Sequence, residues 1–336
     1  MHNYYTALHP LYLKIDMDMK KLSGSVVLCS VLVVLAACCY GILSTIVKIA
    51  LGNGVGIPVI LVGKFFYGWV ILLALVIVVH FLFPRTDKPA KSTLPPWKRG
   101  VVLFFTGIVM CLVTVCYFYS VSYLPVSVAV ILLFQFSWMG VVIEAVANRK
   151  MPSRNQLIAV LIIFVGTIFA GGTIGFGMDI NPFGVVLGLL AAFFYALFVF
   201  LSGRVEPSMR PMNRSFFIAT AGFIFVCALI ACIDSPAAIP AGIFGSDAIV
   251  YGIALGLFGV ALPVLFLAIG APRISTGMAT ILNSIELPVE VLAAAIVLVE
   301  AVSAWQWLGV LIILAGIAFP HLMEKKISSG LVEDAA

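Results

Sequence analysis

The chain has 336 residues; 63% are hydrophobic, 10% are charged, and the formal net charge is +5. A soluble protein of this length could not cover its surface with so little charge. The composition therefore excludes a soluble enzyme or binding domain and predicts a protein embedded in a membrane. The positive charge does not indicate nucleic acid as a partner, because the basic residues are spread over short loops and form no recognised reader motif.

Apolar runs of about 20 residues recur along the whole chain, and that is the length an α-helix needs to cross the hydrocarbon core of a bilayer. The sequence therefore predicts an all-α membrane protein with ten transmembrane helices. The runs lie at 25–48, 57–83, 99–121, 124–147, 155–175, 182–203, 213–233, 247–269, 274–298 and 303–322.

The basic residues occupy every second gap between these runs. Cytoplasmic loops carry an excess of Lys and Arg, and ten crossings put both ends of a chain on one side. We therefore expect both termini in the cytoplasm. Two basic residues, Lys48 and Lys64, depart from the pattern. The 17 that follow it are Lys14, Lys20, Lys21, Arg85, Lys88, Lys91, Lys98, Arg99, Arg149, Lys150, Arg154, Arg204, Arg210, Arg214, Arg273, Lys325 and Lys326.

The amino-terminal segment 1–21 is expected to be a short cytoplasmic tail. The apolar run that follows it is too long for a signal-peptide core and lacks a cleavage motif, so we expect a retained helix. Met17 or Met19 offers an alternative start, in which case residues 1–16 would not belong to the native protein.

Several kinds of site are absent from the sequence. The seven cysteines all lie in apolar stretches, and their odd number argues against a disulfide framework. No cysteine has metal-ligand spacing with a histidine, and the sequence has neither an H-E-x-x-H motif nor an ATPase phosphate loop. We therefore predict no metal, no cofactor and no ATP hydrolysis.

The two halves of the chain match at an offset of 150 residues (306 minus 156). Gln156 to Gly166 aligns with Gln306 to Gly316, and the openings of the halves match at a slightly different offset, with Tyr40 aligned to Tyr195 (195 minus 40 is 155). Five spans per repeat is an odd number, so the second copy must be inverted relative to the first. Inverted repeats are typical of alternating-access transporters whose substrate site lies between the repeats.

On these residues the chain resembles the drug/metabolite transporter superfamily, in particular its EamA-type members with two five-helix repeats. The likeness is greatest over 273–316, where Arg273 and Ser275 begin a span, Pro288 lies within it, and Gln306 and Gly309 follow. The first half departs from the pattern, with Trp138 where Pro is expected, Lys150 for Glu, and Ala159 for Gly. The implied organisation is a first repeat at 22–175, a second at 182–323 and a cytoplasmic tail at 324–336.

The resemblance implies a secondary transporter in a bacterial cytoplasmic membrane, an exporter of small organic metabolites such as amino acids. It also implies membrane lipid as surroundings and a homodimer formed through the fifth and tenth spans. The alternative is a membrane protein that does not transport, either structural, regulatory or an intramembrane enzyme on the same fold.

Three ionisable residues lie deep inside predicted spans, where charge is costly and indicates function. At 1.5 Å per residue, Lys64 lies roughly 10 Å, Glu290 roughly 12 Å and Glu286 roughly 18 Å from the outer ends of their spans. Glu286 and Glu290 share one helix face, Asn283 lies one turn away, and Pro288 can kink the helix as a hinge.

We expect this face to line the cavity, with Lys64 as the ionic partner of Glu290 or of a substrate carboxylate. Two carboxylates one turn apart in a low dielectric repel each other, so one is expected to hold a proton near neutral pH. This would suit proton coupling or the binding of cationic groups. The alternative is a structural Lys–Glu bridge between the second and ninth spans.

Other polar and aromatic residues are candidates for the same cavity, either for polar contacts or for stacking on substrate. Outside it, Lys48 is interpreted as extending to the membrane interface, and Glu144 as pairing locally with Arg149. The candidates are Gln135, Trp138, Tyr40, Tyr117 and Tyr195, together with Ser44 and Thr114.

Overall fold

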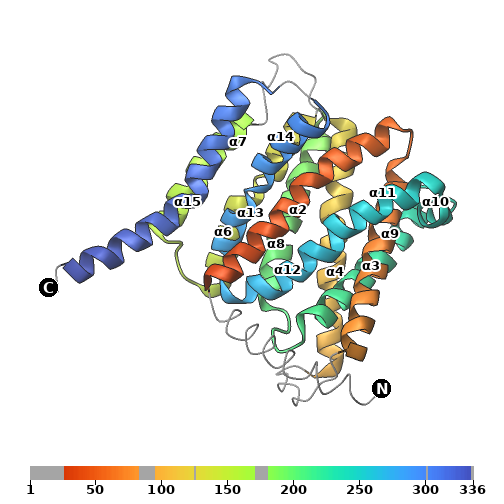
Figure 1. Cartoon of the computed structure of the whole chain (residues 1–336), viewed down its shortest axis with the longest axis horizontal. Helices are drawn as coiled ribbons and strands as arrows, with labels where there is room; N and C mark the ends of the chain where they lie inside the picture. The colour runs from red at the N-terminus through yellow and green to blue at the C-terminus, as the bar shows by residue number, and fades with distance from the viewer. Residues whose placement is uncertain (1–25, 83–94, 125, 171–180, 300–301, 334–336) are drawn as a thin grey trace.

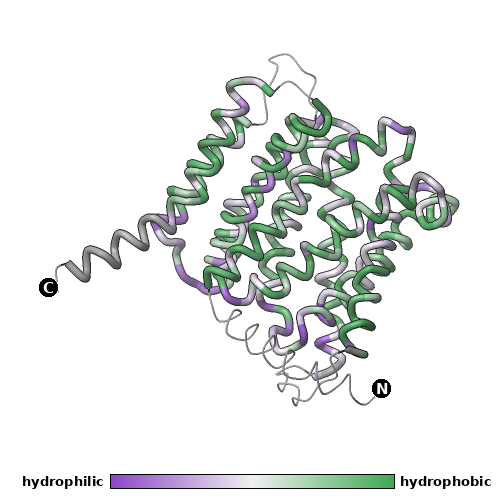
Figure 2. The backbone as a smooth tube through the Cα atoms, viewed as in Figure 1, coloured by the Kyte–Doolittle hydropathy of each residue, from purple (hydrophilic) through white to green (hydrophobic). Residues whose placement is uncertain are grey.

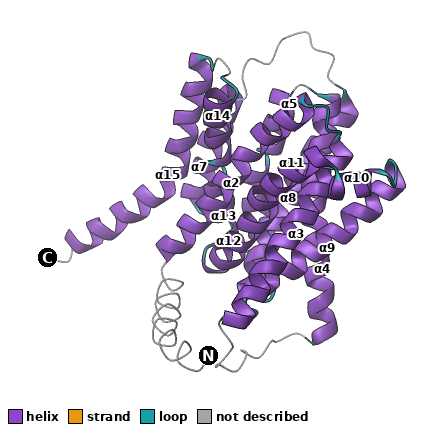
Figure 3. Ribbon diagram, turned by 45° about the vertical axis from the view of Figure 1, so that its right-hand side comes forward, coloured by secondary structure: helices purple, strands orange, loops and turns teal. Residues whose placement is uncertain are grey.

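The structure, a computed structural model, describes residues 26–82, 95–124, 126–170, 181–299 and 302–333, and every regular element in these ranges is a helix (Figures 1 and 3). Eight described stretches are long and apolar enough to cross a membrane. Figure 2 shows that hydrophobic residues dominate these helices along their lengths. The prediction of an all-α polytopic membrane protein is therefore confirmed. The count of ten crossings stays a prediction, because two expected spans coincide with shorter apolar helices at Arg154–Ala170 and Ala304–Pro320.

The described residues of the first half form six helices. They are α2 (Val26–Gly52), α3 (Ile57–Leu82), α4 (Pro96–Tyr123), α5 (Val126–Leu133), α6 (Phe136–Asn148) and α7 (Arg154–Ala170). The second half begins with α8 (Pro182–Arg204), α9 (Pro211–Ile233) and the short α10 (Ala238–Phe244), which the sequence analysis did not predict. It continues with α11 (Ser246–Gly256), the π-helical turn η1 (Leu257–Ala261), α12 (Leu262–Gly270), the 3-10 turn η2 (Ala271–Arg273), α13 (Thr276–Asn283), α14 (Glu286–Val297) and α15 (Ala304–Glu333).

Helices α7 and α15 lie side by side at one edge of the bundle (Figure 1). Small residues allow helices to approach closely in a membrane, where no hydrophobic force drives them together. A side chain on Gly309 would place its Cβ 2.2 Å from the Ala170 backbone nitrogen. The remaining spans surround a central space, with α2, α4 and α8 among its walls.

Two spans that were expected to be continuous are interrupted near their middles. The breaks fall at 134–135, between α5 and α6, and at 284–285, between α13 and α14, again 150 residues apart. In the second repeat, Pro288 has no backbone N–H to donate to the Ser284 carbonyl one turn earlier. The Ser284 hydroxyl in turn donates to the Thr280 carbonyl at 3.3 Å. The break therefore precedes Pro288 by one helical turn.

The first repeat makes the same break without a proline. Gln135 Nε2 donates to the Ile131 carbonyl at 2.9 Å, and the Trp138 indole donates to Gln135 Oε1 at 2.9 Å. The side-chain amide thus supplies the hydrogen bond that the interrupted backbone does not make. Gln135 and Trp138, which were expected in the cavity, are held at this break instead, and Trp138 is 40% exposed.

Arg214 is a structural residue inside a helix, whereas the sequence pattern counted it as a loop charge. It lies in the first turn of α9 with 1% of its surface exposed. Its guanidinium donates to the Val205 carbonyl at 2.9 Å and also to the Ala268 carbonyl. The rigid donor fork of Arg suits such backbone acceptors. Arg214 therefore holds the α8–α9 connection and the end of α12 together.

Candidate functional site

A central cavity lies between the two repeats. It contains about 1120 Å³ of space not filled by atoms, and this volume includes the space at its mouth. The mouth is at the end of the bundle where Leu51, Ile57 and Val121 lie, which we name the open end. The polar and aromatic residues of the lining are Tyr40, Ser44, Lys48, Lys64, Thr114, Tyr117, Phe118, Tyr195, Phe198, Glu286 and Glu290.

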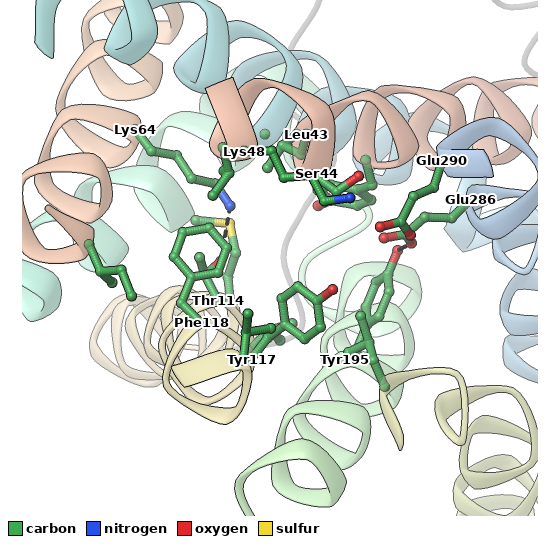
Figure 4. A pocket seen from close by; sticks show the side chains of 18 of the residues that line it. Leu43, Ser44, Lys48, Lys64, Thr114, Tyr117, Phe118, Tyr195, Glu286 and Glu290 are labelled. Carbon is green, nitrogen blue, oxygen red and sulfur yellow. Dashed lines mark hydrogen bonds between the residues drawn. The ribbon is translucent and has the colours of Figure 1, made fainter. Parts of the chain in front are cut away.

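One wall of the cavity carries the two carboxylates of α14. Glu286 is 9% exposed, and its Oε2 accepts a hydrogen bond of 2.8 Å from the Tyr195 hydroxyl. Glu290 lies one turn nearer the open end, where the Ser44 hydroxyl donates to it. Figure 4 shows both carboxylates turned toward the Tyr195 hydroxyl. The wall therefore holds two acidic groups, each of which accepts a hydrogen bond from a neutral hydroxyl.

The opposite wall carries a buried ammonium group. Lys64 on α3 is 4% exposed, and its Nζ donates to Thr114 Oγ1 at 3.0 Å. The same nitrogen lies 5.7 Å from the Phe65 ring centre and 6.0 Å from that of Phe118. An ammonium has three donors and favours a carboxylate when it is buried. Lys64 is thus a cation on the cavity wall with an unused capacity for an anion.

The π-helical turn η1 makes room for the Lys64 side chain. A Cβ on Gly259 would lie 2.7 Å from Lys64 Cε, so the glycine leaves space for the lysine stem. Pro263 follows four residues later and cannot donate to the Gly259 carbonyl, which favours the local widening. Such single turns of π-helix are frequent at functional sites.

Lys64 does not form the predicted ion pair with Glu290. Lys64 bonds to Thr114, and the carboxylate whose charge acts on it is Glu286. The cation that acts on Glu290 is Lys48, because Ser44 and Lys48 follow Tyr40 at four-residue intervals along one face of α2. Lys48 lines the cavity, although the sequence analysis interpreted it as extending to the membrane interface. The four-residue spacing was the signal that could have identified it.

Three tyrosines and a phenylalanine complete the deep part of the site. Tyr40 and Tyr195, which the repeat alignment pairs, meet edge to face with ring centres 5.7 Å apart. Tyr195 also lies 4.5 Å from the ring of Phe136 at the start of α6. Tyr117 faces the space between the lysine wall and the carboxylate wall (Figure 4). The cavity thus offers aromatic surface between its two charged walls.

Asn283 is not one of the lining residues, in contrast to the expectation. It is fully buried at the end of α13, and neither atom of its side-chain amide has a hydrogen-bond partner.

The cavity is closed at the end opposite to its mouth, where α6 packs on α13; we name this the closed end. A Cβ on Gly140 would lie 2.2 Å from Thr280 Cγ2, so the two helices touch through glycine. The hydroxyls of Ser137 and Ser284 are 2.7 Å apart at the crossing of the two breaks. At the open end the corresponding helices α5 and α14 are not packed on each other in this way over their described residues.

Glu144 stabilises this closed end and does not form the predicted local pair with Arg149. Its carboxylate accepts the backbone N–H groups of Thr276 at 3.1 Å and Gly277 at 2.6 Å. These are the first donors of α13, and a helix amino terminus attracts negative charge. Glu144 therefore bridges the two repeats.

Replacing Glu144 with Gln should loosen the closed end. A hydrogen bond to a charged acceptor contributes about 1.5–3 kcal/mol, and a neutral amide can accept only with its single oxygen. We expect faster hydrogen exchange at the Thr276 and Gly277 amides, measured by mass spectrometry on the purified protein. Glu144→Asp, which keeps the charge, is the matched control. Unchanged exchange in the Gln variant would contradict this role.

Comparisons with known proteins agree with this architecture. The model of the EamA-like transporter family matches residues 27–172 and 182–320, one match for each half. The chain belongs to the EamA-like transporter family. It also superposes on a crystal structure of a protein of 18% identity with a TM-score of 0.68, over 89% of this chain and 98% of the other, which shows a shared fold. Among curated proteins, no sequence matches significantly.

Proposed function

We propose that this protein is a secondary transporter of small organic metabolites that alternates access to the central cavity between its two ends. The observation that carries the proposal is a cavity that lies between two inverted repeats, is open at one end and is closed at the other. Each repeat contributes one interrupted helix to the gates. Broken helices around a central site are typical of such transporters.

We further propose a zwitterionic substrate class, such as amino acids or closely related compounds. Lys64 and Thr114 are placed to bind a carboxylate, and Glu286 with Tyr195 is placed to bind an amino group across the cavity. The four charged groups of the lining, two lysines and two glutamates, sum to zero, which suits a zwitterion better than an ion of either sign. The tyrosines would contact the apolar part of the substrate.

We also propose an orientation of the protein in the membrane. Arg149, Arg204 and Arg273 lie at the ends of α6, α8 and η2, all at the closed end. Under the positive-inside rule this end faces the cytoplasm, so the cavity would be open to the outside and both termini cytoplasmic. We place the protein in a bacterial cytoplasmic membrane as a proton-coupled exporter, with contact between two copies along the α7–α15 edge.

Uptake into or release from proteoliposomes tests the transport proposal. Pools of radiolabelled zwitterionic, anionic and cationic metabolites are offered to vesicles that contain the protein and to empty vesicles. We expect flux of a zwitterionic pool that depends on the protein and saturates with concentration. Flux confined to anionic or cationic pools would overturn the substrate class, and absence of flux with every pool would overturn the transport function.

Replacing Lys64 with Met should raise the KM for a zwitterionic substrate by about 10-fold to 100-fold, because a hydrogen bond to a charged group contributes about 1.5–3 kcal/mol. Met keeps the length and the packing of the side chain. Thr114→Val removes the hydroxyl that Lys64 contacts and leaves the ammonium, so it should raise the KM less than Lys64→Met does. An unchanged KM in Lys64→Met would show that this lysine does not bind substrate.

A further inference from the structure

The two gates of the cavity can be compared residue by residue, because their helices follow the same register. α5 and α6 begin at Val126 and Phe136, and α13 and α14 begin 150 residues later at Thr276 and Glu286. At the closed end, α6 of the first repeat packs on α13 of the second. The corresponding pair at the open end is α14 of the second repeat and α5 of the first.

This register shows which residues would meet when the open end closes. Gly140 on α6 corresponds to Glu290 on α14 (290 minus 150), and Thr280 on α13 corresponds to Val130 on α5 (280 minus 150). The closed end depends on a glycine, since even a Cβ would lie 2.2 Å from Thr280. The same contact at the other end would bring a glutamate side chain against an apolar helix.

Charges now surround Glu290 in the open cavity. Lys48 and Ser44 face it from α2, Tyr117 faces it from α4, and Glu286 lies one turn away on α14. α7 and α15 also pack on α14, and over 154–170 and 304–320 their titratable side chain is Arg154, at the opposite end of α7. A carboxylate taken from these polar surroundings into an apolar contact carries a large desolvation cost unless its charge is neutralised.

We propose that Glu290 couples closure of the open end to neutralisation of its own charge, either by a proton or by the ammonium group of a substrate. This rests on the proposed alternating-access function and assigns its coupling step to one residue. With Glu290 ionised, α14 stays away from α5 and the cavity remains open. Protonation, or the ammonium of a zwitterion, removes the net charge and allows α14 to approach Val130. Glu286 remains part of the substrate site and is not the gate residue.

Distances across the open end test this proposal without a transport assay. Genetically encoded spin labels are placed at Val128 on α5 and Ile296 on α14 in the full chain, and the distance distribution is measured by pulsed electron resonance in lipid nanodiscs. For the wild type we expect one long distance at alkaline pH and a second, shorter distance at acidic pH. At alkaline pH, a zwitterionic metabolite should produce the shorter distance, and its analogue with a hydroxyl in place of the amine should not.

In Glu290→Gln, the shorter distance should be present at alkaline pH, with the ratio of closed to open molecules raised by roughly 5-fold to 150-fold, the usual range of coupling between sites. Acid should then cause no further change. Glu290→Gly, which carries the residue found at position 140, should behave in the same way. Glu286→Gln is the matched control and should keep the wild-type response to acid. Monodisperse elution of each variant verifies that it is folded.

The outcomes separate this inference from the proposed function. If Glu290→Gln shows the wild-type distances and the wild-type response to acid, or if Glu286→Gln alone loses that response, the assignment to Glu290 is overturned. If the distances follow Glu290 as expected while proteoliposomes show no flux, the transport proposal fails and the gate assignment stands. Acid-driven closure without any effect of the zwitterion identifies the proton as the neutralising group.

Discussion

Replacing Glu286 with Gln is expected to lower substrate flux by about 30-fold or more at subsaturating substrate. Truncating one partner of a buried, hydrogen-bonded charge pair costs about 2–5 kcal/mol, and 1.4 kcal/mol is a factor of ten. Gln is isosteric, and its side-chain oxygen still accepts the hydrogen bond from the Tyr195 hydroxyl. The loss should therefore report the missing charge for the substrate amine. Initial rates of labelled substrate in proteoliposomes measure it.

Two controls make the Glu286 result specific. Asp234→Asn removes an exposed carboxylate at the end of α9, outside the cavity, and should leave flux unchanged. Tyr195→Phe removes the hydroxyl at 2.8 Å and keeps the carboxylate, so it should cost less than Glu286→Gln. Equal flux in Glu286→Gln and the wild type would remove this carboxylate from the transport mechanism.

A side chain at position 140 is expected to prevent the closed end from forming. A Cβ there would lie 2.2 Å from Thr280 Cγ2 and 2.6 Å from its Oγ1, and overpacking of this kind costs about 1–3 kcal/mol. Gly140→Val should therefore reduce transport by about tenfold and make the closed end accessible. The measurement combines flux with the modification rate of a single cysteine introduced at Ser137, in a background without the native cysteines.

A second substitution that restores transport identifies the contact between positions 140 and 280 as the cause of the defect. Gly140→Ala combined with Thr280→Gly removes the side-chain atoms that an alanine would meet, so the double variant should transport better than Gly140→Ala alone. Thr280→Gly by itself should have a smaller effect than Gly140→Val, because it relieves packing and causes no clash. If Gly140→Val transports like the wild type, the helix contact at position 140 does not form the gate.

The membrane-spanning architecture could be predicted because it depends on local composition. The length of the apolar runs located the helices, and the match between the two halves of the sequence predicted the two-repeat organisation of the family. The two helix breaks at the gates were harder to predict. Pro288 gave a local signal for one break, but the break at Gln135 has no proline and depends on a side-chain amide that bonds to the preceding turn.

The partners of the charged residues could not be predicted from depth alone. Depth along a helix correctly selected Lys64, Glu286 and Glu290 as internal charges, yet it carries no information on which face of which neighbour they meet. Glu144 bonds to backbone atoms 132 and 133 residues away in sequence, a contact that only the packing of α6 on α13 creates. The position of Lys48 near a helix end suggested the interface, and its spacing from Ser44 was the signal that it also lines the cavity.

Substrate-driven proton movement tests the central claim most directly. Proteoliposomes with an enclosed pH-sensitive dye are mixed with zwitterionic metabolites, with wild-type protein in one set and Glu286→Gln/Glu290→Gln in the other. The account predicts a pH change that requires both substrate and protein and disappears in the double variant, while the variant remains folded. An equal pH change in the wild type and in the double variant would contradict it, because proton-coupled transport would then proceed without the two carboxylates of α14.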